Sequence, residues 1–284
     1  MMRSLIRTLL VATSVLSPLT KAELTFKVTS VQQDGRNVDT SSINFVPIPP
    51  LQHRKHPSRL SRAKGERDTI SYSSNWCGAS QHASSQAEQD AISNIFGYFT
   101  VPDLMLRDGH PAPQFAAAWV GIDGAECNSA LLQAGVTTIV NSNGGQSASA
   151  WWEWYPNSAF TIEGLRVRPG EWIGVNITAI DATTAQLVII NADQGQSMTL
   201  DISNGPPLCR IDAEWIMEDF YDSGEQVTFA RFSDLWFVDA AATTVGGQNV
   251  GIDGATMVYL QADDGAILCS AEPWDNSNFV AISH

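Results

Sequence analysis

Residues 172–179 read Trp-Ile-Gly-Val-Asn-Ile-Thr-Ala, and this stretch sets the expected fold class. Every second residue from Ile173 to Ala179 is apolar, and the residues between them are glycine, asparagine and threonine. Successive side chains of a strand point to opposite faces, so this period of two predicts a strand with one buried and one wet face. The wet face carries Asn176, the acceptor of the chain's one N-glycosylation sequon, Asn176-Ile-Thr178.

The same reading extends to further strands, which are separated by turn signals rich in glycine. Strands are predicted at 186–190, 227–232, 235–238 and 257–260, and turns at 143–145, 169–170, 222–224 and 263–265. Only residues 84–93 read as a helix. Many short strands with frequent turns predict one all-β domain, an antiparallel two-sheet β-sandwich, over residues 69–284.

The N-terminus has the order of a secretory signal peptide, predicted over residues 1–22. Arg3 and Arg7 are basic, residues 9–16 are apolar, and Thr20-Lys-Ala22 offers a small-residue cleavage site. The apolar run is roughly half of the ~20 residues that a membrane span needs. We therefore expect an exported protein without a membrane anchor, secreted to the extracellular space.

Residues 23–68 are interpreted as a basic pro-segment. Prolines at four positions are expected to break regular structure, and the stretch from His53 to Arg67 is basic and polar. We expect this segment to be removed close to Thr69, where the composition changes. A disordered tail without a role is the alternative.

Charge is divided unevenly between this segment and the rest of the chain. Residues 69–284 hold five arginines, no lysine and 25 of the 30 acidic residues, so their formal charge is −20. Such a domain repels nucleic acid and anionic membranes, and its self-repulsion falls as carboxylates are protonated. The charge excludes those two partners and suits an acidic medium, although an acidic surface that only aids solubility would look the same.

A lone carboxylate and a lone amide lie in apolar and aromatic stretches. Glu218 ends Ala-Glu-Trp-Ile-Met-Glu, where a strand would place it on one face with Glu214 and Ile216. Gln133 follows two leucines. A carboxylate can take a proton from water and an amide N–H can hold an oxyanion, so this pair suffices for peptide hydrolysis. Solvated polar residues on a strand are the alternative.

Six short stretches are distributed along the chain after residue 68, from residue 74 to residue 220. They are Ser74-Asn-Trp76, Phe99-Thr-Val-Pro102, Ala118-Trp-Val-Gly-Ile-Asp-Gly124, Leu132-Gln-Ala-Gly135, Trp151-Trp-Glu-Trp-Tyr-Pro156 and Ala213-Glu-Trp-Ile-Met-Glu-Asp-Phe220. In this order they resemble the glutamic peptidases, or eqolisins, which are acid proteinases secreted by fungi. The resemblance implies two large antiparallel sheets, lectin-like in outline.

The resemblance also implies roles for individual residues. Gln133 and Glu218 match the family's catalytic pair. Positions that match the substrate cleft are Trp119, Asp123, Trp151, Glu153 and Tyr155. Ordinary core packing is the alternative for Trp119 and Trp154. At three positions, Thr137, Ser149 and Trp152, the chain departs from the residues common in the family, so substrate preference and pH optimum do not follow from the resemblance.

Four cysteines in an exported chain, with no Cys-x-x-Cys spacing, predict disulfides rather than a metal site. A pair similar to Cys127 and Cys209 is bridged in some family members, so the resemblance implies a Cys127–Cys209 disulfide. This leaves Cys77 and Cys269 as the second pair.

Other functions fit the chain less well. Asp222-Ser-Gly224 resembles the triplet of aspartic peptidases, but these need two such carboxylates and the chain has one triplet. Neither Gly-x-Ser-x-Gly nor a zinc-type His-x-x-x-His occurs. Two alternatives stay open: a β-sandwich glycoside hydrolase, which would use two carboxylates such as Glu214 and Glu218, and a non-catalytic carbohydrate-binding module.

We therefore expect a secreted, monomeric acid endopeptidase that acts on polypeptides without metal or cofactor and resists pepstatin. Glu218 would take a proton from the attacking water and later give it to the leaving amine. Gln133 would orient the water and donate an N–H to the tetrahedral oxyanion.

Overall fold

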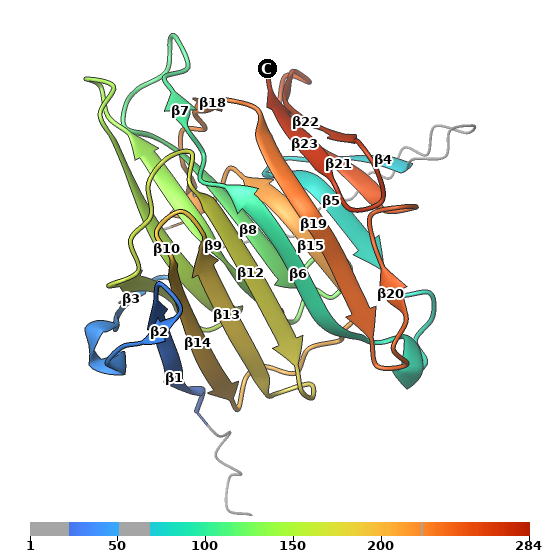
Figure 1. Ribbon diagram of the computed structural model, residues 1–284. Helices are drawn as coiled ribbons and strands as arrows, with labels where there is room; N and C mark the ends of the chain where they lie inside the picture. Colours follow the sequence, from blue (N-terminus) through green and yellow to red (C-terminus); the bar gives the residue numbers. More distant parts are fainter. Residues whose placement is uncertain (1–22, 51–68, 223) are drawn as a thin grey trace, which may run out of the picture.

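The computed structural model describes residues 23–50, 69–222 and 224–284, and almost every element in it is an antiparallel strand (Figure 1). The predicted signal peptide and the basic part of the predicted pro-segment lie outside the described residues. Within the described part, helical structure is limited to two short 3-10 turns, η1 (Thr40–Ser42) and η2 (Glu88–Asp90). The prediction of an all-β antiparallel fold is confirmed.

The strands form two layers. The first layer runs, from edge to edge, through β3 (Asn44–Ile48), β11 (Ala159–Glu163), β10 (Gln146–Tyr155), β9 (Leu131–Val140), β8 (Gln114–Ile122), β15 (Asp212–Glu218), β5 (Trp76–His82), β21 (Thr256–Gln261) and β4 (Thr69–Ser73). Only the β4–β21 pair in this layer is parallel.

The second layer packs behind the first. It runs through β2 (Arg36–Asn37), β1 (Thr25–Gln33), β14 (Gln196–Ser203), β13 (Ala185–Asn191), β12 (Trp172–Ala179), β6 (Ile92–Thr100), β19 (Leu235–Thr244), β23 (Phe279–Ser283) and β22 (Ile267–Pro273). Strand β22 also pairs with β21, so hydrogen bonds join the two layers along one side of the molecule.

Three shorter pairs complete the fold. Strand β20 (Asn249–Val250) extends β19, β7 (Leu104–Met105) pairs with β18 (Arg231–Phe232), and β16 (Tyr221–Asp222) forms a hairpin with β17 (Glu225–Gln226). The last hairpin contains Asp222, which is exposed, and this agrees with the interpretation of Asp222-Ser-Gly224 as a turn. No helix in the described ranges has the length and apolar character of a membrane span.

The alternation of side chains along the first layer separates the core from the candidate site. On β15, Ala213, Trp215 and Met217 belong to the main core between the layers, whereas Ile216 belongs to a second apolar cluster on the opposite face. Strands β8, β9 and β10 divide in the same way. We call this opposite face of the first layer the site face. Its cluster consists of Trp76, Ala117, Trp119, Leu131, Trp151, Ala159, Ile216, Phe220 and Val258.

The local predictions were correct where one face of a strand is wet. The stretch 172–179 is β12, and Asn176 lies half-buried on the face turned away from the core, where its Oδ1 accepts from Asn94 Nδ2 at 2.8 Å. The predicted strand at 227–232 is wrong over residues 227–230, and only Arg231–Phe232 is a strand. The predicted helix over 84–93 is wrong except for the single 3-10 turn η2.

Residues 23–50 contribute three strands, β1 to β3, although their prolines were expected to break regular structure. Pro47 lies inside β3, across from Phe160 of β11. A proline cannot donate to a strand ladder, but an edge strand has one side without a partner, and β3 is an edge strand. The prediction was therefore wrong at Pro47.

Two disulfides join distant segments. Cys127 pairs with Cys209 and Cys77 with Cys269, with Cα–Cα distances of 6.0 and 5.9 Å. Both expected pairings are confirmed. Disulfides persist in oxidising compartments, so the two bridges fit an extracellular protein.

Candidate active site

Glu218 is the last residue of β15, and three side chains hold its carboxylate on the site face. Its Oε1 accepts from Asn75 Nδ2 and Trp76 Nε1, both at 3.0 Å, and its Oε2 accepts from Trp119 Nε1 at 2.8 Å. Glu218 is fully buried. A buried carboxylate without hydrogen bonds is costly, so these donors explain how an acid can lie in an aromatic cluster.

Two glycines allow neighbouring strands of the first layer to approach closely beside the site. Gly135 lies across from Trp119 on one side and Trp151 on the other, and a Cβ on Gly135 would lie 2.6 Å from Trp119 Cβ and 2.1 Å from Ala118 O. Gly78 has a φ of 153°, and a Cβ there would lie 2.1 Å from Trp215 O. A residue larger than glycine at either position would displace the strands that carry the site.

Gln133 is held by a neighbouring carboxylate. It lies on β9 directly across from Glu153 on β10, and its Nε2 donates to Glu153 Oε2 at 2.7 Å. Both side chains are fully buried. A primary amide has two N–H hydrogens, so this bond fixes the orientation of the amide and uses one of them.

Gln133 and Glu218 lie on the same face but are not direct neighbours. Strand β8 runs between β9 and β15, with Gln133 across from Gly121 and Glu218 across from Ala117. Trp119 lies between these two positions on β8 and donates to Glu218. The two side chains are therefore diagonal neighbours with Trp119 at the middle of the diagonal. The residue of β15 in the same row as Gln133 is Glu214.

The other predicted residues divide between the site face and the core. Trp151 is buried in the site-face cluster and Tyr155 is half-buried against it. Trp119 belongs to the site face, whereas Trp154 lies in the main core, where its Nε1 donates to Pro206 O at 2.9 Å. Within the described part of the chain, the buried Trp151 Nε1–H has no acceptor.

Asp123, which directly follows β8, is buried and is held by backbone groups. Its Oδ2 accepts from the backbone N–H of Arg210 and its Oδ1 from that of Ile211, both at 2.9 Å. These bonds fix the chain just before β15, so the geometry gives Asp123 a positioning role. Burial raises the pKa of Asp123 to about 6 against the opposing effect of these hydrogen bonds. Its contact with substrate stays a prediction.

Two further buried carboxyls, Asp219 next to Glu218 in sequence and Glu214 on the same strand, favour the protonated form. Burial, and then the charge of Glu218, raises the pKa of Asp219 to about 8, although a 2.9 Å bond from Gln226 Nε2 opposes this. Burial raises the pKa of Glu214 well above its ordinary value, with Asp212 and Asp123 adding to the effect. At acidic pH both groups are neutral, so they add no negative charge to this part of the molecule.

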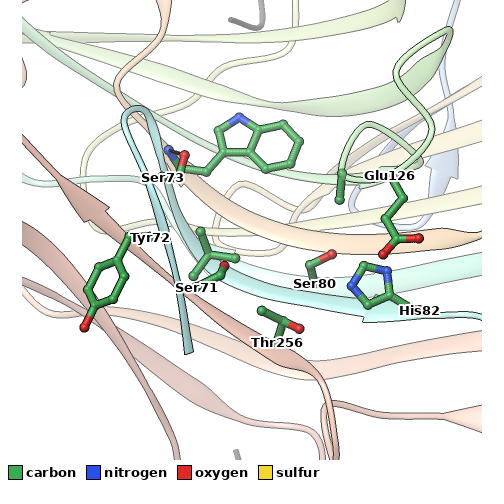
Figure 2. Close-up of a pocket in the computed structure, with 10 residues that line it drawn as sticks. Ser71, Tyr72, Ser73, Ser80, His82, Glu126 and Thr256 are labelled. Carbon is green, nitrogen blue, oxygen red and sulfur yellow. Dashed lines mark hydrogen bonds between the residues drawn. The ribbon is translucent and has the colours of Figure 1, made fainter. Parts of the chain in front are cut away.

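A pocket of about 90 Å³ opens beside Trp76 (Figure 2). Hydroxyl groups line it, and His82 and Glu126 lie at one end. The His82 ring nitrogen Nδ1 is 2.8 Å from Asp212 Oδ1, and this contact raises the pKa of His82. The residues with hydroxyls are Ser71, Tyr72, Ser73, Ser80 and Thr256.

The direct partners of the carboxylate could not be read from the sequence. Asn75 and Trp76 were part of a recognised stretch, but no role was assigned to them. Nothing in local spacing connects them to Glu218, since the contacts span 143 and 142 positions. The available signal was the presence of two polar-aromatic stretches, residues 74–76 and 213–220, and it does not specify which donor reaches which oxygen.

The comparisons with known proteins agree with this geometry. A family model described as the Peptidase A4 family matches residues 74–284. Aspergillopepsin-2 of Aspergillus niger is 34% identical over 215 residues, which are 69% of this chain and 73% of that protein. Scytalidopepsin B of Scytalidium lignicola is 35% identical over 158 residues, which are 52% of this chain and 59% of that protein.

A solved structure of scytalido-glutamic peptidase with a peptide-based transition-state analogue superposes with a TM-score of 0.63 at 27% identity, and the match covers 74% of this chain and 98% of that chain. The fold is therefore shared over nearly all of that peptidase. The family model spans well over half of this sequence. The chain belongs to the peptidase A4 family, the glutamic peptidases or eqolisins, and is a peptide hydrolase of that type.

Proposed function

We propose that the chain is an acid endopeptidase in which Glu218 and Gln133 perform the chemistry on a peptide group bound over Trp119. The family membership supports peptide hydrolysis, and relatives of this family have been solved with peptide-based ligands. The observation that carries the assignment to Glu218 is its set of three N–H donors, the consecutive residues Asn75 and Trp76 and, from β8, Trp119.

Glu218 acts first as a general base. Its carboxylate takes a proton from a water molecule, and the oxygen of that water attacks the carbonyl carbon of the scissile bond. Glu218 then returns the proton to the leaving amine. The three donors keep the carboxylate in one orientation, so it meets the water without reorganising.

Gln133 stabilises the tetrahedral oxyanion. Glu153 fixes the orientation of the amide, and an amide N–H of Gln133 donates to the developing negative charge when substrate is bound. Glu153 is thus a positioning residue for Gln133. The N–H of Trp151 donates to a carbonyl of the bound peptide, and the indoles and Tyr155 take up apolar side chains.

Substitution of the two catalytic residues tests this function. Glu218→Gln is expected to abolish turnover of a denatured protein at acidic pH, because an amide cannot accept the proton and a positioned base contributes about 10²–10⁴-fold. Gln133→Ala is expected to lower kcat by about 10²–10³-fold, the usual effect of losing one oxyanion donor. A folded Glu218→Gln protein with more than about a tenth of the wild-type turnover would reject the mechanism.

Glu214→Gln is the matched control. Glu214 is on the same strand and face and is fully buried, but burial favours its protonated, neutral form. An amide imitates a protonated carboxyl in size and charge, so this variant is expected to fold and to keep much more activity. Equal losses in Glu214→Gln and Glu218→Gln would show that the effect is not specific to the proposed base.

Secretion and removal of the N-terminal segment also belong to this proposal. The two disulfides and the acidic domain support an extracellular, acidic setting. N-terminal sequencing of protein recovered from the medium checks it, and a new N-terminus close to Thr69 is expected. The absence of any new N-terminus between residues 51 and 74 would contradict the proposed boundary.

A further inference from the structure

Strands β1, β2 and β3 precede the catalytic domain in sequence and pair with it in the folded structure. We infer that residues 25–48, which we call the clasp, are a permanent part of the folded enzyme. After the chain is cut between residues 50 and 69, the clasp stays bound to the edge of the sandwich as a second, non-covalent chain. This inference goes beyond the proposed function and does not depend on the roles of Gln133 and Glu218.

The clasp pairs with both layers at once. Its first strand, β1, forms eight registered antiparallel pairs with β14, from Thr25–Ser203 to Gln33–Gln196. Its last strand, β3, forms five with β11, from Asn44–Glu163 to Ile48–Ala159. Without the clasp, β14 and β11 would be the edges of the two layers (Figure 1). Added strands of this kind bind through main-chain hydrogen bonds.

An aromatic cluster joins the clasp to the body. The Phe26 ring lies 5.0 Å from Trp152 and 4.9 Å from Phe160, and 5.0 Å from Phe45 within the clasp. Val31 and Ile43 of the clasp are buried in the main core. Loss of the clasp would therefore expose aromatic surface and two strand edges together, a combination that leads to aggregation.

Trp152 fits this arrangement. It is one of the positions where the chain departs from the residues common in the family, and its ring is stacked on Phe160 at 5.1 Å with an interplanar angle of 17°. The matched family model begins at residue 74 and so does not include the clasp. The indole of Trp152 lies where the clasp meets the body, in contact with Phe26 of the clasp and Phe160 of β11.

Charge separates the clasp from the sequence that follows it. The clasp has two basic residues, Lys27 and Arg36, whereas residues 51–68 have six. The strongly basic character that distinguishes the N-terminal segment from the acidic domain therefore belongs to residues 51–68 and not to the clasp. The clasp also reaches the site face, because Ile48 packs against the cluster that contains Trp119 and Trp151.

Protein purified from the medium under native, acidic conditions tests the inference. A single peak from size-exclusion chromatography is analysed by N-terminal sequencing and by mass spectrometry after denaturation. The expected result is two N-termini in equal amounts, one at or shortly after Glu23 and one close to Thr69. One N-terminus close to Thr69, with no clasp peptide in the peak, would overturn the inference.

A protein that is secreted uncut is tested with a lysine-specific endoprotease. Lysine occurs only at positions 21, 27, 55 and 64, so this enzyme cannot cut the catalytic domain. Cleavage is expected after Lys55 or Lys64 but not after Lys27, which is held in β1 across from Asp201, and the pieces are expected to elute together. Where both sites resist, a specific protease site inserted between residues 51 and 68 gives the cut. Cleavage at Lys27 as fast as in a denatured chain, or separation of the pieces, would overturn the inference.

Two variants identify what holds the clasp. Phe26→Ser combined with Phe45→Ser removes its aromatic contacts, and after cleavage the clasp is expected to separate from the body. The control is Val38→Ser, since Val38 is 41% exposed and lies in the same segment. The control is expected to keep the clasp. If the double variant does not fold, the result with the unaltered chain still decides the question.

Discussion

The carboxylate of Glu218 is positioned by residues that are remote in sequence, and the Trp119 contact tests how much this matters. Trp119→Phe keeps a ring in the site-face cluster but removes the 2.8 Å bond to Glu218 Oε2. Hydrogen bonds to charged groups contribute about 1.5–3 kcal/mol, so we expect kcat/KM to fall by about 10- to 100-fold in steady-state assays at acidic pH.

Trp154→Phe is the control for this substitution. It also removes a buried indole N–H, but that group donates to Pro206 O in the main core. We expect a lower melting temperature with little change in kcat/KM. If the two variants lose activity equally, the N–H of Trp119 has no particular role in catalysis.

Glu153 tests whether the orientation of Gln133 matters. Glu153→Ala removes the acceptor of the 2.7 Å bond from Gln133 Nε2, and we expect kcat to fall by at least about 10-fold. Glu153→Gln keeps an acceptor oxygen, so it should recover most of that loss. A rise in KM with unchanged kcat in Glu153→Ala would instead show that Glu153 contacts substrate.

The sequence identified the two reactive groups but not their surroundings. Glu218 and Gln133 were found because they lie among apolar and aromatic residues, and the family resemblance supplied their roles. The donors Asn75 and Trp76 lie at the start of β5, far away in sequence, and the register of β5 against β15 brings Trp76 across from Glu218. Asp123 matched a cleft position, but its burial and its backbone partners became visible only in three dimensions.

At the scale of the elements, strands with one wet face were predictable and edge strands were not. β12 has a clear alternation, so residues 172–179 were placed correctly. β3 contains Pro47, and the rule that proline breaks a strand fails when the strand lies at an edge. Pairing partners could not be predicted at all, because β1 reaches β14 across about 170 residues, and local periodicity contains no information about such contacts.

The Cys127–Cys209 disulfide is expected to stabilise the start of β15. It closes a loop of 82 residues, and chain-entropy estimates give about 4 kcal/mol for a loop of this length. The same loop brings the backbone N–H groups of Glu126 and Cys127 to Asp212 Oδ2, at 2.7 and 3.1 Å. The double variant Cys127→Ala, Cys209→Ala should therefore lose about that much unfolding free energy in urea titrations at acidic pH.

An unchanged unfolding free energy would contradict this prediction. Digestion of the unreduced protein at low pH, followed by mass spectrometry, verifies the pairing. A peptide that joins Cys127 to Cys77 would contradict the Cys127–Cys209 pairing.

The whole molecule is built for acidic conditions in two ways. Residues 69–284 carry a formal charge of −20 at neutral pH, and protonation of surface carboxylates relieves that repulsion. The buried carboxyls act in the same direction but through desolvation, because Asp219, Asp123 and Glu214 all favour the protonated form in the folded state. The first effect was visible in the composition, and the second required the structure.

The buried carboxyls predict how stability depends on pH. The pKa of Asp219 is raised from 3.8 to about 8 and that of Asp123 to about 6, so between these limits the folded state holds protons that the unfolded state has lost. The contribution of these two protons to the free energy of unfolding is fully present below about pH 4. It falls by up to about 1.4 kcal/mol per pH unit for each group as the pH rises, up to about pH 6 for Asp123 and about pH 8 for Asp219. Stability measured by urea unfolding should therefore fall steadily from pH 4 to pH 8.

Asp219→Asn isolates one of these groups. Asparagine imitates the protonated carboxyl and can still accept the bond from Gln226 Nε2, so the variant should be about as stable as the wild type at pH 4. It should lose less stability than the wild type between pH 4 and pH 8, because its side chain has no proton to release. Asp263→Asn, at an exposed turn, changes the net charge by the same amount and controls for surface repulsion. If both variants flatten the pH dependence equally, the net charge causes the loss at neutral pH, and the buried Asp219 does not.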